Sequence, residues 1–143
     1  MTTRSWIFSL GLACAALAGG AHLDRAAAQA PAAPATPGFK RTELQRHDLA
    51  TAGREAVLAR AEFAGGVATP KHTHPGEEVG VVIEGEVMFE IDGKPALKLK
   101  AGDSFFIPPN TPHLARNASK TAGAVVVSTY ILEKGKPLAT PVK

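Results

Sequence analysis

From residue 57 to residue 132 the sequence repeats one pattern, a short apolar run that ends at glycine, proline or aspartate. Runs of this kind, spaced about 8–12 residues apart, are typical of strands in an all-β sandwich or barrel. In the first run, alternation places Val57, Ala59, Ala61 and Phe63 on one face of an extended chain. No sustained helical period appears after residue 30. We therefore predict an all-β fold.

Further strands are predicted at residues 78–84, 86–91, 97–100, 104–107, 113–116 and 124–132. Residues 79–83 form a nearly continuous apolar run, which predicts a strand buried on both faces. Leu97 and Leu99 alternate with lysines, so that strand should have one face in water. Residues 40–50 are polar and leave two alternatives open, a first strand or an arm that pairs with another subunit.

A group of metal-ligand residue types lies between two of these runs, where His72 and His74 are followed by Glu78. Residues two apart on an extended strand project from the same face, so both imidazoles should point the same way. The Pro75-Gly76 turn allows Glu78 to open the next strand and return a carboxylate to that face. Two imidazoles and one carboxylate suit Fe(II), Mn(II), Ni(II), Cu(II) or Zn(II).

A second motif follows between residues 102 and 117, GDSFFIPPNTPHLARN. Together the two stretches resemble the two signature motifs of the cupin superfamily, and the resemblance extends over residues 57–132. The first motif matches throughout, and the second matches at Gly102, Pro108, His113 and Asn117. Asn110 stands where the family usually has glycine, and asparagine is the residue best able to replace glycine at a positive φ angle.

The resemblance implies a double-stranded β-helix, the small jelly-roll barrel of cupins. It implies His113 as the fourth ligand of one divalent metal, beside His72, His74 and Glu78. Four protein ligands leave one or two coordination positions for water or substrate. It also implies a homodimer. Structural roles are expected for Asn117 and for the turn glycines, which are Gly66, Gly85 and Gly102.

Substrate contacts are harder to predict than ligands. The expected cavity lining is mostly apolar and comprises Val82, Met88, Phe89, Phe105, Phe106, Ile107, Leu114 and Tyr130. Arg116 and Tyr130 are the predicted polar anchors. Glu77 should face away from the site, and His47, outside both motifs, is expected on the surface.

The N-terminal residues have the composition of a secretory signal peptide. Arg4 precedes an apolar run at residues 6–18, which is followed by alanine-rich sequence. We predict a signal peptide at 1–30, a linker or N-terminal arm at 31–50 and a cupin barrel at 51–143. The expected location is periplasmic or secreted, without a stable membrane anchor. Cys14, the only cysteine, lies in the signal region, so the barrel should have neither a disulfide nor a thiolate ligand.

The charge balance argues against a nucleic-acid partner. The formal net charge is +3, from 16 basic and 13 acidic residues, and the basic residues are scattered along the chain. A small-molecule ligand or substrate is the expected partner instead.

The resemblance to quercetin dioxygenase-like cupins implies a metal-dependent dioxygenase acting on a small phenolic or enol-type substrate. In that reaction Glu78 would be the catalytic general base. Two alternatives stay open. One is a metal-dependent lyase or isomerase that does not use O₂, and the other is a non-catalytic protein that binds a metal or small ligand.

Overall fold

The computed structural model describes residues 35–142. The predicted signal peptide and Cys14 lie outside the described residues. The described chain is all-β, and it contains no helix with the length and apolar character needed to span a membrane. Its strands are β1 (Phe39–Asp48), β2 (Arg54–Phe63), β3 (His72–Thr73), β4 (Glu77–Glu84), β5 (Glu86–Ile91), β6 (Leu97–Lys100), β7 (Ser104–Ile107), β8 (His113–Asn117), β9 (Ala124–Glu133) and β10 (Thr140–Pro141).

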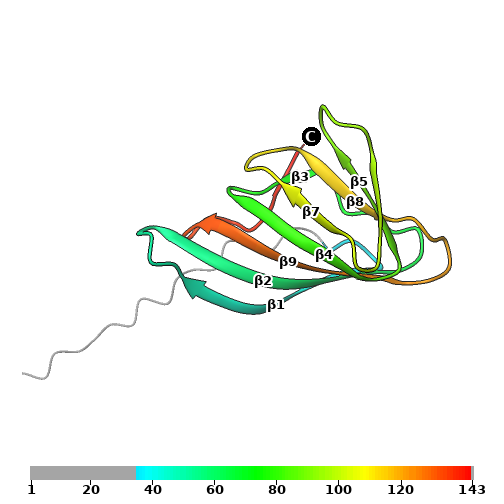
Figure 1. Ribbon diagram of the computed structural model, residues 1–143, viewed down its shortest axis with the longest axis horizontal. Helices are drawn as coiled ribbons and strands as arrows, with labels where there is room; N and C mark the ends of the chain where they lie inside the picture. The colour runs from blue at the N-terminus through cyan, green and yellow to red at the C-terminus, as the bar shows by residue number, and fades with distance from the viewer. Residues whose placement is uncertain (1–34, 143) are drawn as a thin grey trace, which may run out of the picture.

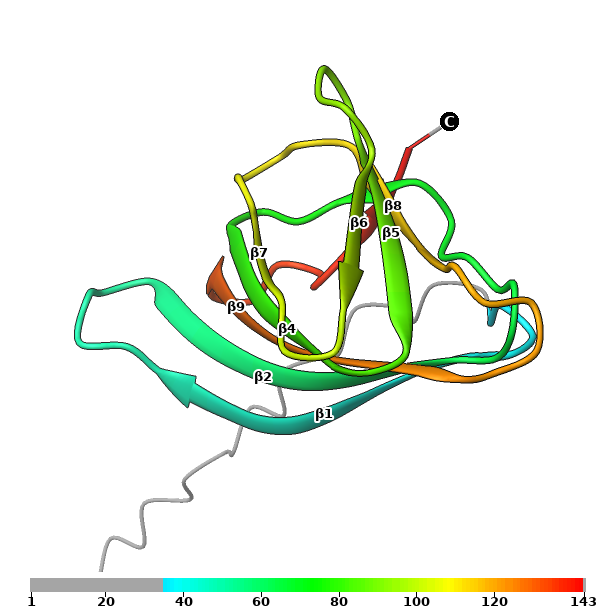
Figure 2. The same cartoon turned by 45° about the vertical axis from the view of Figure 1, so that its right-hand side comes forward.

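The strands form two antiparallel sheets that curve toward each other (Figures 1 and 2). Sheet A has the order β1-β2-β9-β4-β7, and sheet B has the order β10-β3-β8-β5-β6. The chain alternates between the sheets from β3 onward, because β4 and β7 belong to sheet A while β5, β6 and β8 belong to sheet B. This is the predicted double-sheet jelly roll.

The core lies between the inner faces of the two sheets. Strand β2 alternates as predicted, with Val57, Ala59, Ala61 and Phe63 all buried. In sheet B, strand β5 contributes its own alternate residues, which are Val87, Phe89 and Ile91. Period-two burial places every second residue of each strand in the core, so polar residues at those positions face the interior too. The functional site depends on this property.

The prediction that residues 79–83 are buried on both faces is wrong for the single chain. Val79 is 46% exposed and Ile83 is 50% exposed, while Val82 is buried. Phe106 of β7, the cross-strand partner of Val79, is 53% exposed. The reason is that no described element of the chain covers the outer face of sheet A at β4 and β7. Similarly, β6 buries Leu99 but leaves Leu97 39% exposed.

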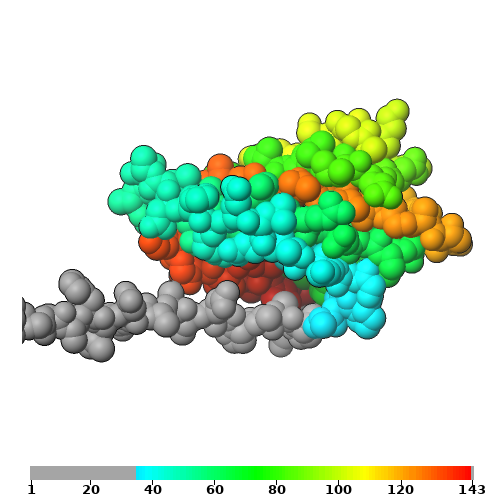
Figure 3. All heavy atoms as spheres, turned by 90° about the horizontal axis from the view of Figure 1, so that it is seen from below, coloured from blue at the N-terminus to red at the C-terminus, as the bar shows by residue number. Residues whose placement is uncertain are grey.

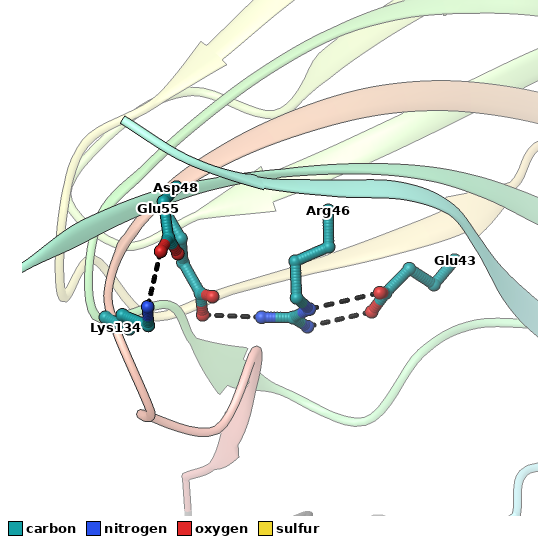
Figure 4. Close-up of polar contacts among 5 residues, drawn as sticks. All are labelled: Glu43, Arg46, Asp48, Glu55 and Lys134. Carbon is teal, nitrogen blue, oxygen red and sulfur yellow. Dashed lines mark hydrogen bonds and ion pairs between the residues drawn. The ribbon is translucent and has the colours of Figure 1, made fainter. Parts of the chain in front are cut away.

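Strand β1 decides between the two alternatives for residues 40–50, because it pairs with β2 along its whole length as the edge of sheet A. A register shift between Glu43 and Gln45 leaves Leu44 exposed. Ion pairs stabilise the β1–β2 hairpin, in which Arg46 lies between Glu43 and Glu55 (Figure 4). Charged side chains on an edge strand also oppose pairing with other chains.

The turns have the expected backbone geometry. Gly66, Gly85 and Gly102 have positive φ angles, and Asn110 has a φ of 55°, as its replacement of glycine predicts. Asn117 is 1% exposed, and its side-chain amide donates to the carbonyl oxygens of Ala64 and Ala122. Its role is therefore structural, since these buried hydrogen bonds join β8 to the neighbouring loops.

Candidate metal centre

The three motif histidines meet on the inner face of sheet B. His72 and His113 are direct cross-strand partners on β3 and β8, and their ring centroids are 4.5 Å apart. His74 comes immediately after β3, with ring centroids 4.8 Å from His72 and 5.1 Å from His113. All three are buried, and one nitrogen of each lies within 4.8 Å of the others. The structure thus assembles the predicted imidazole cluster.

A backbone carbonyl orients each imidazole through Nδ1. The three contacts are His72 to Pro70 O (2.7 Å), His113 to Thr111 O (2.9 Å) and His74 to Leu138 O (2.5 Å). A carbonyl oxygen only accepts, so each Nδ1 carries the proton and each Nε2 presents a lone pair. Histidine ligands of metals are typically fixed in this way, by a second contact that selects the tautomer.

Glu78 faces the histidines from β4 of sheet A. Its Oε2 lies 3.1 Å from Nε2 of His74 and 3.5 Å from Nε2 of His113. Burial alone raises the pKa of the Glu78 carboxyl, but the His113 and His74 imidazoles outweigh burial and the pKa falls well below its usual range. The carboxylate is therefore ionised. Burial also lowers the pKa of His72 to about 3, so that ring is neutral at pH 7.

The atoms that face one another across the site show whether these residues fit a metal ion. Nε2 of His74 is buried and makes no hydrogen bond with any described residue, although Oε2 of Glu78 is close. With the proton on Nδ1, the facing Nε2 and Oε2 atoms are both acceptors, so the low pKa of Glu78 requires a positive charge between them, from a second proton on the ring or from a cation. A metal ion satisfies both, and neutral imidazoles with one carboxylate suit the divalent transition metals. The residues present therefore fit such a metal, without distinguishing which one.

A small cavity adjoins the histidines and leaves about 20 Å³ open to the centres of water-sized molecules. Its lining residues are Arg41, Ala61, Phe63, Thr69, His72, Glu78, Phe89, His113, Ala115, Val126, Ser128 and Tyr130. Of the lining residues predicted from sequence, only Phe89 and Tyr130 are present. Phe106 faces outward because it is out of phase with the inner face of β7.

One of the two predicted polar anchors is wrong. Arg116 is exposed on the outer face of β8, where it forms an ion pair with Glu90 at 2.5 Å. Tyr130 does line the cavity, and its ring centroid is 4.7 Å from that of His74. Burial, together with the nearby Glu78 charge, raises the pKa of the Tyr130 phenol, so the phenol stays protonated.

The remaining predicted positions are as expected. Glu77 faces away from the cavity and pairs with Arg54 at 2.8 Å, and His47 is exposed on β1. Sequence reasoning missed the polar lining residues Arg41, Thr69 and Ser128, and the three carbonyls that orient the imidazoles. With β1 established as a strand, alternation puts Arg41 on the same face as Phe39, but the sequence left open whether residues 40–50 form a strand. The orienting carbonyls could not be predicted, because every residue has a backbone carbonyl and no side-chain type marks the ones that contact the histidines.

Comparison with known proteins gives a match to the family model described as the cupin domain, over residues 59–130. Dimethylsulfoniopropionate lyase DddQ of Ruegeria pomeroyi is 34% identical over 76 residues, covering 53% of this chain and 38% of the lyase. Oxalate oxidase 2 of Hordeum vulgare is 35% identical over 79 residues, covering 50% of this chain and 35% of the oxidase. The chain thus matches less than two-fifths of either relative's length.

Solved structures extend the likeness over more of the chain. Oxalate oxidase in complex with the substrate analogue glycolate has a TM-score of 0.60 and 31% identity, covering 75% of this chain and 57% of the oxidase. A cupin-like protein of Thermotoga maritima has a TM-score of 0.61 and 26% identity, covering 73% of this chain and 75% of that protein.

Proposed function

This chain belongs to the cupin family, and on that basis we propose that it is a metal-dependent enzyme acting on a small organic substrate. One observation carries the proposal. Three buried imidazoles are each fixed at Nδ1 by a backbone carbonyl, so three Nε2 lone pairs converge beside an ionised carboxylate. The predicted ligand set, His72, His74, Glu78 and His113, leaves room in the coordination sphere for substrate.

When bound there, a divalent metal supplies a Lewis acid that polarises a substrate oxygen. The chain's own groups divide the remaining work. Glu78 is ionised and within reach of the same space, so it serves as the general base that accepts a substrate proton. Tyr130 stays protonated and lines the same cavity, so it serves as a hydrogen-bond donor. Burial of all these groups excludes bulk water.

The size of the cavity narrows the substrate. A cavity of about 150 Å³ is needed to hold a benzene ring, whereas this one leaves about 20 Å³. A phenolic ring therefore does not fit the space beside the histidines, so of the two predicted substrate types we keep the enol-type one, to which the likeness to oxalate oxidase adds small organic acids. The space as it stands holds about one water molecule, so entry of even a two-carbon acid requires side chains of the cavity to move.

Two reaction classes follow from two different relatives. Likeness to oxalate oxidase, which extends over 75% of this chain, supports an oxidation that consumes O₂. Likeness to dimethylsulfoniopropionate lyase supports an elimination in which Glu78 removes a proton without O₂. We place the O₂-dependent reaction first because the structural likeness covers more of the chain at higher identity than the 23% of the lyase structure.

The test begins with the metal content of the purified protein, beside His113→Ala. About one equivalent of metal in the wild type and none in the variant is the expected result. Glycolate, oxalate, lactate and pyruvate are then supplied in an oxygen electrode, and the same acids are incubated without air. Turnover that stops without air supports the oxidase, and turnover that continues supports the lyase. Turnover in metal-free protein would contradict both.

We also propose export, on the composition of residues 1–30. Cell fractionation followed by mass determination tests it, and the expected result is an extracytoplasmic protein that has lost its first residues. An unprocessed cytoplasmic protein would contradict the proposal.

A homodimer is the remaining part of the proposal. The exposed apolar residues of sheet A, Val79, Ile83 and Phe106, form a face that a second copy would cover. Sedimentation equilibrium should show a dimer in the wild type and a monomer for Phe106→Glu. Identical masses would place the interface elsewhere or exclude it.

A further inference from the structure

Arg41 is the charged residue of the cavity that the metal centre does not account for. It lies on β1 opposite Ala61, a buried residue of the cavity wall, and it lines the cavity with His72 and Glu78. Its guanidinium carbon is 5.8 Å from the ring centroid of Tyr130 and 5.4 Å from that of Phe39. Nε is buried, and it makes no hydrogen bond with any residue of the described chain.

Another arginine of β1, Arg46, has carboxylate partners and can be compared with Arg41. Arg46 donates twice to Glu43 and once to Glu55, so its guanidinium is bracketed by two carboxylates (Figure 4). Arg41 forms no ion pair with any carboxylate in residues 35–142. Its positive charge is therefore available at the cavity.

A guanidinium in this position needs a particular complement. It is charged at every pH the protein meets, and its planar fork of N–H donors matches the two oxygens of a carboxylate. A divalent metal bound by the imidazoles and the single Glu78 carboxylate would keep a net positive charge, because one carboxylate neutralises only one of its two charges. The cavity thus combines two positive centres in a space too small for a large molecule.

We propose that Arg41 anchors a carboxylate of the substrate, so that the enzyme takes small carboxylate anions in preference to neutral molecules. This inference rests on the proposed function, because the substrate must reach both Arg41 and the metal. A hydroxyacid or ketoacid of two or three carbons has the required arrangement, with a carboxylate at one end and an oxygen for the metal at the other. A guanidinium also pairs with phosphate, so it is the small size of the cavity that disfavours the bulkier tetrahedral phosphate and sulfate ions.

The experiment measures binding, not turnover. Wild type, Arg41→Gln, Arg41→Lys and Arg46→Gln are loaded with Co(II), and glycolate is titrated while the visible absorption of the Co(II) is followed. Arg46→Gln is the matched control, since it removes the same charge from the same strand outside the cavity. Glycolaldehyde, phosphate and sulfate are titrated in parallel, and thermal unfolding verifies that each variant is folded.

We expect all four proteins to hold one Co(II), with glycolate affinity reduced roughly 10- to 100-fold in Arg41→Gln. Arg41→Lys should retain part of the affinity, and Arg46→Gln should match the wild type. Equal losses in Arg41→Gln and Arg46→Gln would overturn the anchor, as would tighter binding of glycolaldehyde or phosphate than of glycolate. Cobalt binding without glycolate binding in the wild type refutes this inference alone, whereas failure to bind cobalt refutes the proposed function as well.

Discussion

Sheet B and sheet A contribute different chemistry to one buried space. Sheet B, with the residue that follows its strand β3, supplies the three imidazoles. Sheet A supplies the oxygen-bearing and cationic groups, which are Arg41, Glu78, Ser128 and Tyr130. The contrast teaches that most of the metal ligands lie on sheet B and most of the groups that would contact substrate lie on sheet A, with Glu78 belonging to both sets, so substitutions on the two sheets should have separable effects.

The largest effect should come from removing an imidazole of sheet B. For His113→Ala we expect metal affinity to fall roughly 100- to 1000-fold, because a binding free energy of 10–16 kcal/mol shared by four ligands is about 3 kcal/mol each. Competition with a chelator of known affinity measures it. His47→Ala, an exposed histidine on β1, is the control and should bind as the wild type does. Equal affinities for the wild type and His113→Ala would remove His113 from the ligand set.

A smaller loss should follow from removing the end of sheet B. Ending the chain after Lys136 eliminates β10 and the Leu138 carbonyl that orients His74. Loss of such an orienting partner typically reduces metal affinity about 10- to 100-fold. Leu138→Ala, which only loosens packing against Val57, Ala59, Tyr130 and Leu132, should reduce it less. Unchanged affinity in the shortened protein would show that His74 is held by the segment that follows β3 and does not need the Leu138 carbonyl.

On sheet A, Glu78→Gln should separate the two functions. Metal affinity should drop about tenfold, since one charge is lost while three imidazoles remain, and turnover should disappear with the general base. Glu77→Gln is the matched control, because Glu77 points the other way and pairs with Arg54. Affinity and turnover measured on the same samples decide the question. Retained turnover in Glu78→Gln would assign the base to another residue.

The smallest effect is expected for Tyr130→Phe. Metal affinity should change by no more than about threefold, because a neutral phenol contributes at most a modest hydrogen bond to this site. Isothermal titration with the metal measures it. A loss as large as that of His113→Ala would add Tyr130 to the metal-binding residues and contradict the division between the two sheets.

The sequence predicted the residues whose side chains carry the chemistry, but it could not predict all their surroundings. Histidines two residues apart, followed after one turn by a carboxylate, were enough to predict that His72, His74 and Glu78 share one site. The asparagine in place of the usual glycine predicted the positive φ angle of Asn110. Arg41 was not identified because residues 40–50 had no clear strand signal, and their position beside β2 depends on tertiary pairing. Arg116 was misplaced because alternation along β8 puts His113 inside and residue 116 outside.

The contact between His74 and Leu138 also bears on when the protein acquires its metal. The carbonyl that fixes His74 lies downstream of both histidine motifs, so a ribosome releases all three imidazoles before the segment that completes their arrangement. A nascent chain therefore has an unfinished set of ligands. If the chain is exported before it folds, it binds its metal outside the cytoplasm. The concentrations of the metal ions in that compartment then determine which metal the mature protein contains.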